Sequence, residues 1–250
     1  MDEMRRKIVS DEGCFASTFE RQYYRKGDMF VKRCLRKSEY RTGYRGLYIP
    51  KLGMERLRNE AASLLFVQES TNVPVPRLYD HFDHDGAYYI AMEYIEGVCM
   101  SSLAEDQKEA VAKQIEIYLS TLHNLKSTKI GGPAGIIVPP YRIVEKTEDQ
   151  TWNLPTEGRL YSFCHMDLSQ HNVIVDPETL KINAIIDMEY SQAFGPNNLI
   201  YLSTEGLVLR SLAIAKLTIH SSYSNFSLSV LITLLSRNYT AKDIVSLGPQ

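Results

Sequence analysis

The chain has 250 residues, of which 44% are apolar and 23% are charged, and its formal net charge at pH 7 is −2. This composition predicts a globular protein with one large domain or two small lobes, and the near-neutral charge gives no argument for binding nucleic acid or an anionic membrane. No apolar run is long enough to span a bilayer or to act as a secretory signal, and the four cysteines stand singly. We therefore expect a cytoplasmic protein with neither nucleic-acid nor membrane partners.

The first third of the chain is predicted to be rich in β-strands. Residues Phe19 to Lys32 contain two β-prone runs on either side of a turn at Gly27-Asp28, which is the pattern of a hairpin. The segment from Arg41 to Gly53 contains three glycines and a proline and predicts a loop.

A helix is expected after this loop. It ends before the prolines of the segment Asn72 to Pro76, because a residue that precedes proline is pushed out of the α region. One set of residues falls at helical spacing, and a polar set is expected to cover the other face. The first set is Leu57, Ala61, Leu64, Leu65 and Gln68, and the polar set is Arg56, Arg58 and Asn59.

A second hairpin and a linker follow this helix. The run from His81 leads to a turn at Gly86 and then to a strand over Tyr88 to Tyr94, and Ile95 to Gly97 predicts a short linker. Beyond the linker, an apolar stripe predicts a helix and three short apolar runs predict strands. The stripe is Val111, Ile115, Tyr118, Leu119 and Leu122, and the strands are 162–164, 173–175 and 184–186.

This layout predicts an α+β fold with two lobes around a cleft. Residues 1–96 form a β-rich first lobe with one helix, residues 97–190 form a mainly helical second lobe, and the hinge lies near Glu93 to Gly97. Ligands favour clefts between such lobes. Residues 191–250 are left as a tail of uncertain structure.

Three polar side chains beside the predicted strands are suited to phosphoryl transfer. Asp167 and Asn172 lie five positions apart on a loop that an apolar strand follows, and Asp187 ends the next strand. Transfer of a phosphoryl group from ATP needs Mg²⁺ with oxygen ligands and a carboxylate that takes the proton of the acceptor hydroxyl. Asn172 and Asp187 are candidate metal ligands, and Asp167 is the candidate base. The alternative is that Asp167 and Asn172 only cap a turn.

Two further places would complete a nucleotide site. Lys32 on a predicted strand and Glu60 on the following helix have the order of a phosphate-binding lysine and its carboxylate partner, although each alone is typical of solvated surface charge. The strand that runs into the linker can offer backbone groups of Glu93 and Ile95 to an adenine edge. A plain edge strand followed by a turn is the alternative for this segment.

The chain resembles the aminoglycoside phosphotransferase and choline-kinase-like family, especially its fungal members with unassigned substrates. The most specific matching stretches are Phe163 to Leu168 and Ile185 to Tyr190, and the matches together cover about two thirds of the chain. The others are Tyr23 to Lys32, Leu57 to Ala62, Val73 to Pro76 and Met92 to Gly97.

This resemblance implies a bilobal protein-kinase-like fold and an ATP- and Mg²⁺-dependent phosphotransferase. Lys32 would contact the ATP phosphates and Glu60 would pair with Lys32, Asp167 would be the catalytic base, and Asn172 and Asp187 would bind Mg²⁺. The acceptor would be a hydroxyl of a small molecule, such as an amino sugar or an amino alcohol.

The sequence also departs from this family. No glycine-rich phosphate loop is visible, Met188 stands where relatives have Trp, and the family pattern stops at about Tyr190, so residues 191–250 are either a folded segment or an artefact of the gene model. A nucleotide-binding pseudo-enzyme without turnover is therefore the alternative function. A protein kinase is a third hypothesis, disfavoured by Met166 and by the lack of an Ala-Pro-Glu element after Asp187.

Overall fold

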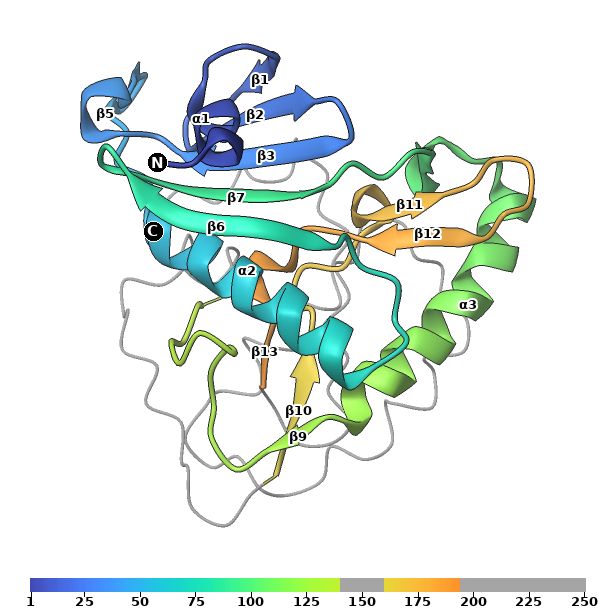
Figure 1. The fold of residues 1–250 in the computed structure, drawn as a ribbon. Helices are drawn as coiled ribbons and strands as arrows, with labels where there is room; N and C mark the ends of the chain where they lie inside the picture. Colours follow the sequence, from blue (N-terminus) through green and yellow to red (C-terminus); the bar gives the residue numbers. More distant parts are fainter. Residues whose placement is uncertain (140–159, 194–250) are drawn as a thin grey trace, which may run out of the picture. The chain divides into compact units, whose positions relative to one another are not determined.

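The structure is a computed structural model that describes residues 1–139 and 160–193. A five-stranded antiparallel sheet forms the first half, with the order β1-β2-β3-β7-β6 (Figure 1). In the centre of this sheet, Lys32 pairs with Tyr23 on one neighbouring strand and with Ile90 on the other. The strands are β1 (Cys14–Ser17), β2 (Arg21–Lys26), β3 (Met29–Cys34), β6 (Leu78–His84) and β7 (Ala87–Glu93). Both predicted hairpins are confirmed.

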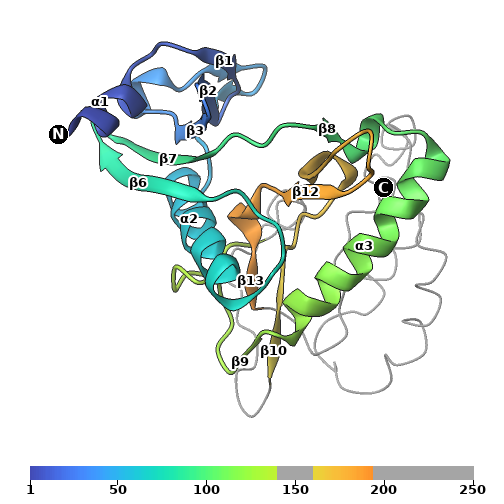
Figure 2. The ribbon, with the colours of Figure 1, turned by 45° about the vertical axis from the view of Figure 1, so that its right-hand side comes forward.

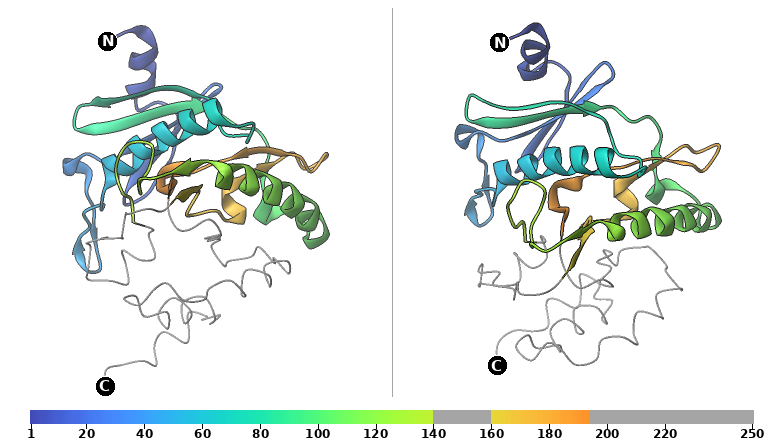
Figure 3. Two further views of the ribbon diagram at one scale, coloured as in Figure 1. Left: turned by 90° about the horizontal axis from the view of Figure 1, so that it is seen from below. Right: turned by 60° about the horizontal axis from the view of Figure 1, so that its bottom comes forward.

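Two helices accompany the sheet. Helix α1 (Glu3–Val9) begins at Asp2, whose side chain accepts a hydrogen bond from the Arg5 N–H, and it buries Ile8. Helix α2 (Gly53–Ser70) contacts β3, β6 and β7 and runs along one face of the sheet in both views of Figure 3. The segment before α2 holds the 3₁₀ turn η1 (Lys37–Glu39) and a small strand pair, β4 (Thr42–Gly43) with β5 (Gly46–Leu47).

The polar face predicted for helix α2 is partly wrong. Arg56 and Asn59 were expected on a polar face, but both are buried, whereas Leu65 is exposed and Arg58 is exposed as expected. The physical reason is that α2 is covered on a second side by the 3₁₀ turn η4 (Met188–Tyr190), against which it packs. Helix α1 was not predicted, so the first 96 residues contain two α-helices rather than one.

The part beyond the linker contains one long helix and short strands. Helix α3 (Glu105–Asn124) begins with two acidic residues and buries the predicted stripe except Tyr118, which is half-buried. Two three-stranded sheets have the orders β13-β10-β9 and β12-β11-β8. Their strands are β8 (Val98–Cys99), β9 (Lys126–Ser127), β10 (Tyr161–Cys164), β11 (Val173–Val175), β12 (Ile182–Ile185) and β13 (Gln192–Ala193), and the 3₁₀ turns here are η2 (Met100–Ser102) and η3 (Gln170–Asn172).

The second lobe was predicted to be mainly helical, and its described residues are not. Among them α3 is the one α-helix, and short strands and single turns make up the remainder. Strand β12 lies between β7 and α3 in Figures 1 and 2, where Gln114 of α3 hydrogen-bonds to the backbone of Leu180 and Ile182. These strands place the loops that carry the polar residues of the candidate site. The tail from residue 194 onward, about which two interpretations were left open, lies outside the described residues.

One apolar core joins the two parts of the described chain. It includes buried residues of α2 and β7 together with residues of α3, β10 and β11. The rings of Phe66 and Phe163 meet edge to face with their centroids 5.2 Å apart. The linker approaches β11 so closely at Gly97 that an added Cβ would stand 2.6 Å from the Val175 carbonyl oxygen, and Gly97 has a φ of +136°. No helix of the described residues is long and apolar enough to cross a membrane.

Candidate functional site

Lys32, Glu60 and Asp187 meet at the centre of the described chain. The Lys32 ammonium donates to both Glu60 carboxylate oxygens at 2.8 and 3.0 Å and to Asp187 Oδ1 at 2.7 Å. Lys32 lies on strand β3, Glu60 on helix α2, and Asp187 two residues after β12, directly before η4. The Lys32 and Glu60 side chains are 7% and 2% exposed, and that of Asp187 is 31% exposed, so this carboxylate faces solvent. The predicted pairing of Lys32 with Glu60 is therefore present.

The electrostatics of this group follow from burial and proximity. Burial lowers the pKa of Lys32, but Asp187 and Glu60 outweigh that effect and raise this pKa above its usual value. Burial raises the pKa of Glu60 to about 7, although Lys32 acts in the opposite direction. The pKa of Asp187 is lowered, because the attraction of Lys32 exceeds the cost of burial. One ammonium thus serves two carboxylates, which leaves the cluster with a surplus of one negative charge when both are ionised.

A closed ring of four hydrogen bonds joins the loop of Asp167 to the segment of Asp187. His165 Nε2 lies 2.9 Å from the Ile186 carbonyl oxygen, and the Asp167 N–H donates to His165 Nδ1 at 3.3 Å. The Ile186 N–H donates to the Asn172 carbonyl at 2.9 Å, and Asn172 Nδ2 donates to the Asp167 carbonyl at 2.8 Å. Burial lowers the pKa of His165, which favours the neutral ring with its proton on Nε2. His165 therefore holds the loop of Asp167 to the segment of Asp187.

Two residues of these loops have unusual backbone angles. Met166 has a φ of +66° and Asp187 a φ of +65°, both in the left-handed region that side chains other than glycine rarely adopt. Such conformations persist only where the surroundings enforce them, and they concentrate at functional sites. Here they adjoin the candidate base and form the candidate metal ligand.

The residues at this place fit a hard divalent cation. Asp187 uses Oδ1 for Lys32, and Asn172 uses its amide nitrogen for the Asp167 carbonyl, so the Asn172 side-chain oxygen faces away from that bond. Oxygen donors of this kind are the ligands that Mg²⁺ prefers, and the negative charge that the cluster carries when Glu60 and Asp187 are both ionised supports the fit. Glu60, Asp187 and Glu189 also have carboxylate oxygens within 4.8 Å of one another. The Glu60 carboxylate is already paired with Lys32, and the Glu189 carboxylate is already paired with two arginines.

The linker and the strand end before it differ in how their backbone donors are used. The Glu93 N–H donates to the Arg77 carbonyl and the Tyr94 N–H donates to the Asp28 carbonyl, each at 2.8 Å. The Ile95 N–H makes no hydrogen bond to another described residue. Ile95 therefore retains a donor for a planar ligand edge, whereas at Glu93 the N–H is already used within the sheet.

Sequence reasoning did not anticipate a buried group of charges behind this cluster. Arg21 of β2 and Arg56 of α2 bind Glu189, which follows Asp187 by two positions, and all three are buried. Two signals in the sequence could have found them. Arg56 and Glu60 are four positions apart and so share one face of α2, and Glu189 repeats the acidic character of Asp187.

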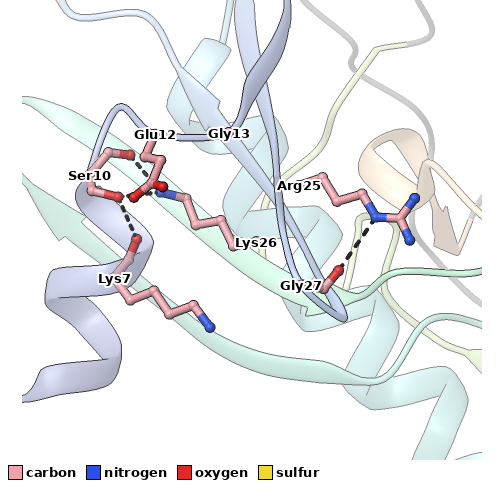
Figure 4. A pocket seen from close by; sticks show the side chains of 7 residues that line it. All are labelled: Lys7, Ser10, Glu12, Gly13, Arg25, Lys26 and Gly27. Carbon is pink, nitrogen blue, oxygen red and sulfur yellow. Dashed lines mark hydrogen bonds between the residues drawn. The ribbon is translucent and has the colours of Figure 1, made fainter.

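A surface pocket lies elsewhere, between α1 and the turn that joins β2 to β3 (Figure 4). Lys7, Arg25 and Lys26 line it, opposite Glu12. The Lys26 ammonium already donates to the carbonyl and hydroxyl oxygens of Ser10 at 2.6 and 2.7 Å, and the Arg25 guanidinium binds Glu96 and lies over the Tyr94 ring. None of the predicted site residues lines this pocket.

Comparisons with known proteins show the family of the chain and the type of its fold. The family model described as "Phosphotransferase enzyme family" matches residues 11–193. The fold is similar to that of aminoglycoside phosphotransferase APH(3″)-Id from Streptomyces rimosus ATCC10970, with a TM-score of 0.51, 17% identity, and coverage of 76% of this chain and 78% of that one. It is also similar to a mutant of aminoglycoside 2′-phosphotransferase-IIIa in its GDP complex, with a TM-score of 0.52, 15% identity, and coverage of 78% and 71%. The predicted α+β kinase-like fold is confirmed for the described part.

A curated protein also matches over a short stretch. Serine/threonine-protein kinase D of Synechocystis sp. (strain ATCC 27184 / PCC 6803 / Kazusa) is 30% identical over 77 residues, which are 31% of this chain. The match spans 15% of the length of that protein.

Proposed function

This chain belongs to the phosphotransferase enzyme family, and on that premise we propose that it transfers a phosphoryl group from ATP to a hydroxyl of a small molecule. The observation that carries the proposal is the meeting of Lys32, Glu60 and Asp187, joined by hydrogen bonds to the loop of Asp167 and Asn172. Phosphoryl transfer depends on positioning and on charge stabilisation more than on covalent chemistry. A rigid group of charges next to a carboxylate supplies both.

The residues around Lys32 would bind the nucleotide. Lys32, held by Glu60, would contact the phosphates, and the Ile95 N–H with backbone groups of Glu93 would meet the adenine edge. Asn172 and Asp187 would hold Mg²⁺, which supplies charge neutralisation on the phosphates when bound. We also propose the division expected from the sequence, with residues 1–96 binding the nucleotide and residues 97–190 carrying the catalytic loop.

Asp167 would act as the catalytic base. Its carboxylate would orient the acceptor hydroxyl and take its proton as the new bond to phosphorus forms. The hydrogen bonds of its N–H to His165 and of its carbonyl to Asn172 fix its backbone for this role. The protein therefore contributes a base whose position is set before substrate arrives.

The class of acceptor is inferred from relatives. The chains of similar fold are aminoglycoside phosphotransferases, and one of them was solved with GDP bound. A small molecule with hydroxyl groups, such as an amino sugar or an amino alcohol, is the acceptor class we propose. The pseudo-enzyme remains the second candidate, because the family match ends at residue 193 and leaves the last 57 residues unmatched (250 − 193).

The decisive experiment compares the wild-type chain with Asp167→Asn. We expect Mg²⁺-dependent transfer from ATP to a panel of amino sugars and amino alcohols, and a loss of about 10²- to 10⁴-fold in kcat in the variant. Asp106→Asn, which alters an exposed acid of α3, is the matched control and should retain full turnover. Unchanged turnover in Asp167→Asn would remove Asp167 as the base. Nucleotide-induced thermal stabilisation without transfer to any acceptor would favour the pseudo-enzyme.

A further inference from the structure

A buried network of charges lies directly behind the site. Arg21 Nη2 contacts Glu189 Oε2 at 3.0 Å, and Arg56 Nη1 contacts Glu189 Oε1 at 3.2 Å, so each carboxylate oxygen has its own guanidinium. The three side chains are 4%, 6% and 10% exposed. Three distant parts of the sequence, β2, α2 and η4, therefore meet on one carboxylate.

The network extends beyond this carboxylate. Arg56 also donates to the Tyr190 hydroxyl at 2.6 Å and pairs with Glu20, which lies between β1 and β2. Asn59, one turn along α2, donates to the backbone carbonyls of Glu189 and Ser191 at 3.1 and 2.9 Å. Helix α2 thus holds both the side chains and the backbone of the turn that begins at Asp187.

The charges of this network balance, unlike those of the Lys32 cluster. Arg21 and Arg56 face Glu20 and Glu189, which are two positive and two negative charges. Both oxygens of Glu189 are taken by guanidinium groups, so this carboxylate has no surplus charge for a cation even though it lies within 4.8 Å of Asp187. The surplus lies with Asp187 and Glu60, which share Lys32.

This arrangement is not one that maximises stability. The Nε atoms of Arg21 and Arg56 are buried without a hydrogen-bond partner among the described residues, and an unpaired buried donor costs free energy. Buried ion pairs are in general weak sources of stability. A network that tolerates this cost is better explained by what it positions.

We propose that Arg21, Arg56 and Glu189 form a clamp of positioning residues that sets the place of Asp187 for the metal. The proposal rests on the proposed function, because it concerns the Mg²⁺ site of that function. Asp187 has a left-handed backbone. Arg21 and Arg56 hold the turn after it by donating to the carboxylate of Glu189, two residues later. Glu189 acts through Asp187 and does not itself bind the metal. The link from Arg56 to Glu20 extends the same clamp to the turn between β1 and β2.

The test measures Mg²⁺ binding in the full chain without requiring turnover. Tm is measured at saturating ADP while the Mg²⁺ concentration is varied. The readout is the Mg²⁺ concentration at which half of the Mg²⁺-dependent rise in Tm is reached. Residues that orient a metal ligand typically alter metal affinity by about 10- to 100-fold, so Arg56→Met and Glu189→Gln should each raise this concentration by about that factor. The double variant should show a defect no larger than the more affected single variant, because both changes disable one clamp.

Matched controls separate the clamp from other causes. Arg58→Met removes a neighbouring arginine of α2 that makes an exposed pair with Asp83, and it should keep the wild-type Mg²⁺ requirement. If Arg56→Met does not unfold cooperatively, Arg56→Lys serves instead, since a lysine keeps the charge but cannot reach Glu20, Glu189 and Tyr190 together. The double variant removes one charge of each sign, so the net charge of the network stays balanced, with Arg21 and Glu20 as the remaining charges.

The outcomes distinguish the two proposals. A wild-type Mg²⁺ requirement in the folded Arg56 variant would overturn the clamp alone. Defects that multiply in the double variant would also overturn it, because they would assign Glu189 a separate role as a metal ligand. A wild-type chain that binds Mg²⁺ with ADP but transfers no phosphate would overturn the proposed function and leave the clamp intact. The absence of any Mg²⁺-dependent rise in Tm would overturn both.

Discussion

Lys32 and Arg33 are consecutive residues of β3, and both are buried, but they lie on opposite faces of the sheet and meet different partners. Lys32 faces α2 and shares its one ammonium between Glu60 and Asp187. Arg33 faces the other side and makes a two-pronged pair with Glu39, at 2.6 and 2.7 Å. It also donates to the Tyr24 hydroxyl and to Gln22.

The difference separates a site from a structural support. The Arg33 guanidinium has an acceptor for each of its nitrogens, and its carboxylate partner is satisfied in turn by the Arg36 N–H. The Lys32 cluster keeps a surplus carboxylate that faces solvent. Two neighbouring buried cations therefore teach that burial alone does not mark function. A charge imbalance at an opening is the feature that makes the Lys32 cluster the candidate site, because a charged ligand improves the electrostatics there.

The largest effect is expected for Lys32→Met. The variant removes the cation that, among the described residues, links Glu60 to Asp187, and that would meet the nucleotide phosphates. Loss of one such electrostatic contact typically costs about 10²- to 10³-fold in kcat. Steady-state turnover with ATP measures it. The exposed Lys37→Met is the matched control. Turnover in Lys32→Met equal to that of the control would place the phosphates elsewhere.

Arg33→Met should lower the stability of the protein and leave its turnover unchanged, in contrast to Lys32→Met. Removing one partner of a buried ion pair leaves Glu39 with Arg36 as its donor and Gln22 with Tyr24, and we expect the free energy of unfolding to fall by about 3 kcal/mol. Below its melting temperature the variant should keep its turnover. Urea unfolding measures the first quantity and kcat the second. A large loss of kcat with unchanged stability would reverse the distinction between the two faces.

The smallest effect is expected for Glu39→Gln, in the dependence of Tm on pH under acidic conditions. The hydrogen bonds from Arg33, aided by the Arg36 N–H, lower the pKa of Glu39 from 4.5 to about 2. A carboxyl whose pKa is lower in the folded state contributes stability that is complete above about pH 4.5 and is lost as the pH falls towards about 2. Glu39→Gln should therefore flatten this part of the dependence of Tm on pH. If Tm falls equally steeply with decreasing pH in the variant, the loss of stability in acid is due to other carboxyl groups.

Much of the site could be predicted because its residues follow strong local patterns. Asp167, Asn172 and Asp187 flank apolar strands at spacings that tie them to short loops, and Lys32 and Glu60 follow from a strand and a helix in the right order. The structure brings Lys32, Glu60 and Asp187 together and joins them to the loop of Asp167 and Asn172. Their catalytic and metal-binding roles stay predictions that the experiments above test.

The burial of Arg21 and Arg56 could not be predicted in the same way, although the spacing of Arg56 and Glu60 places both on one face of α2. A helix with Arg56 and Asn59 between apolar positions has the periodicity of an amphipathic surface helix, and periodicity cannot tell water from a second layer of protein. The layer that covers them, η4, is more than 120 positions away in the sequence (188 − 56 = 132). Asn59 is also covered by a residue far away in the sequence, since a Cβ added at Gly132 would overlap the Asn59 side chain. Short elements with little periodicity, such as α1 and β1, were missed for lack of signal.

The ring of hydrogen bonds through His165, Asp167, Asn172 and Ile186 has a consequence for tolerance to damage. In an open chain of contacts, losing one bond releases the segment beyond it, and the freed backbone gains conformational entropy. Here two of the four bonds, His165 to Ile186 and Ile186 to Asn172, join the two segments, so a break in either one leaves the other in place. The second break is the one that frees a loop. The loss of one of these two bonds therefore leaves the loops of Asp167 and Asp187 joined by the other.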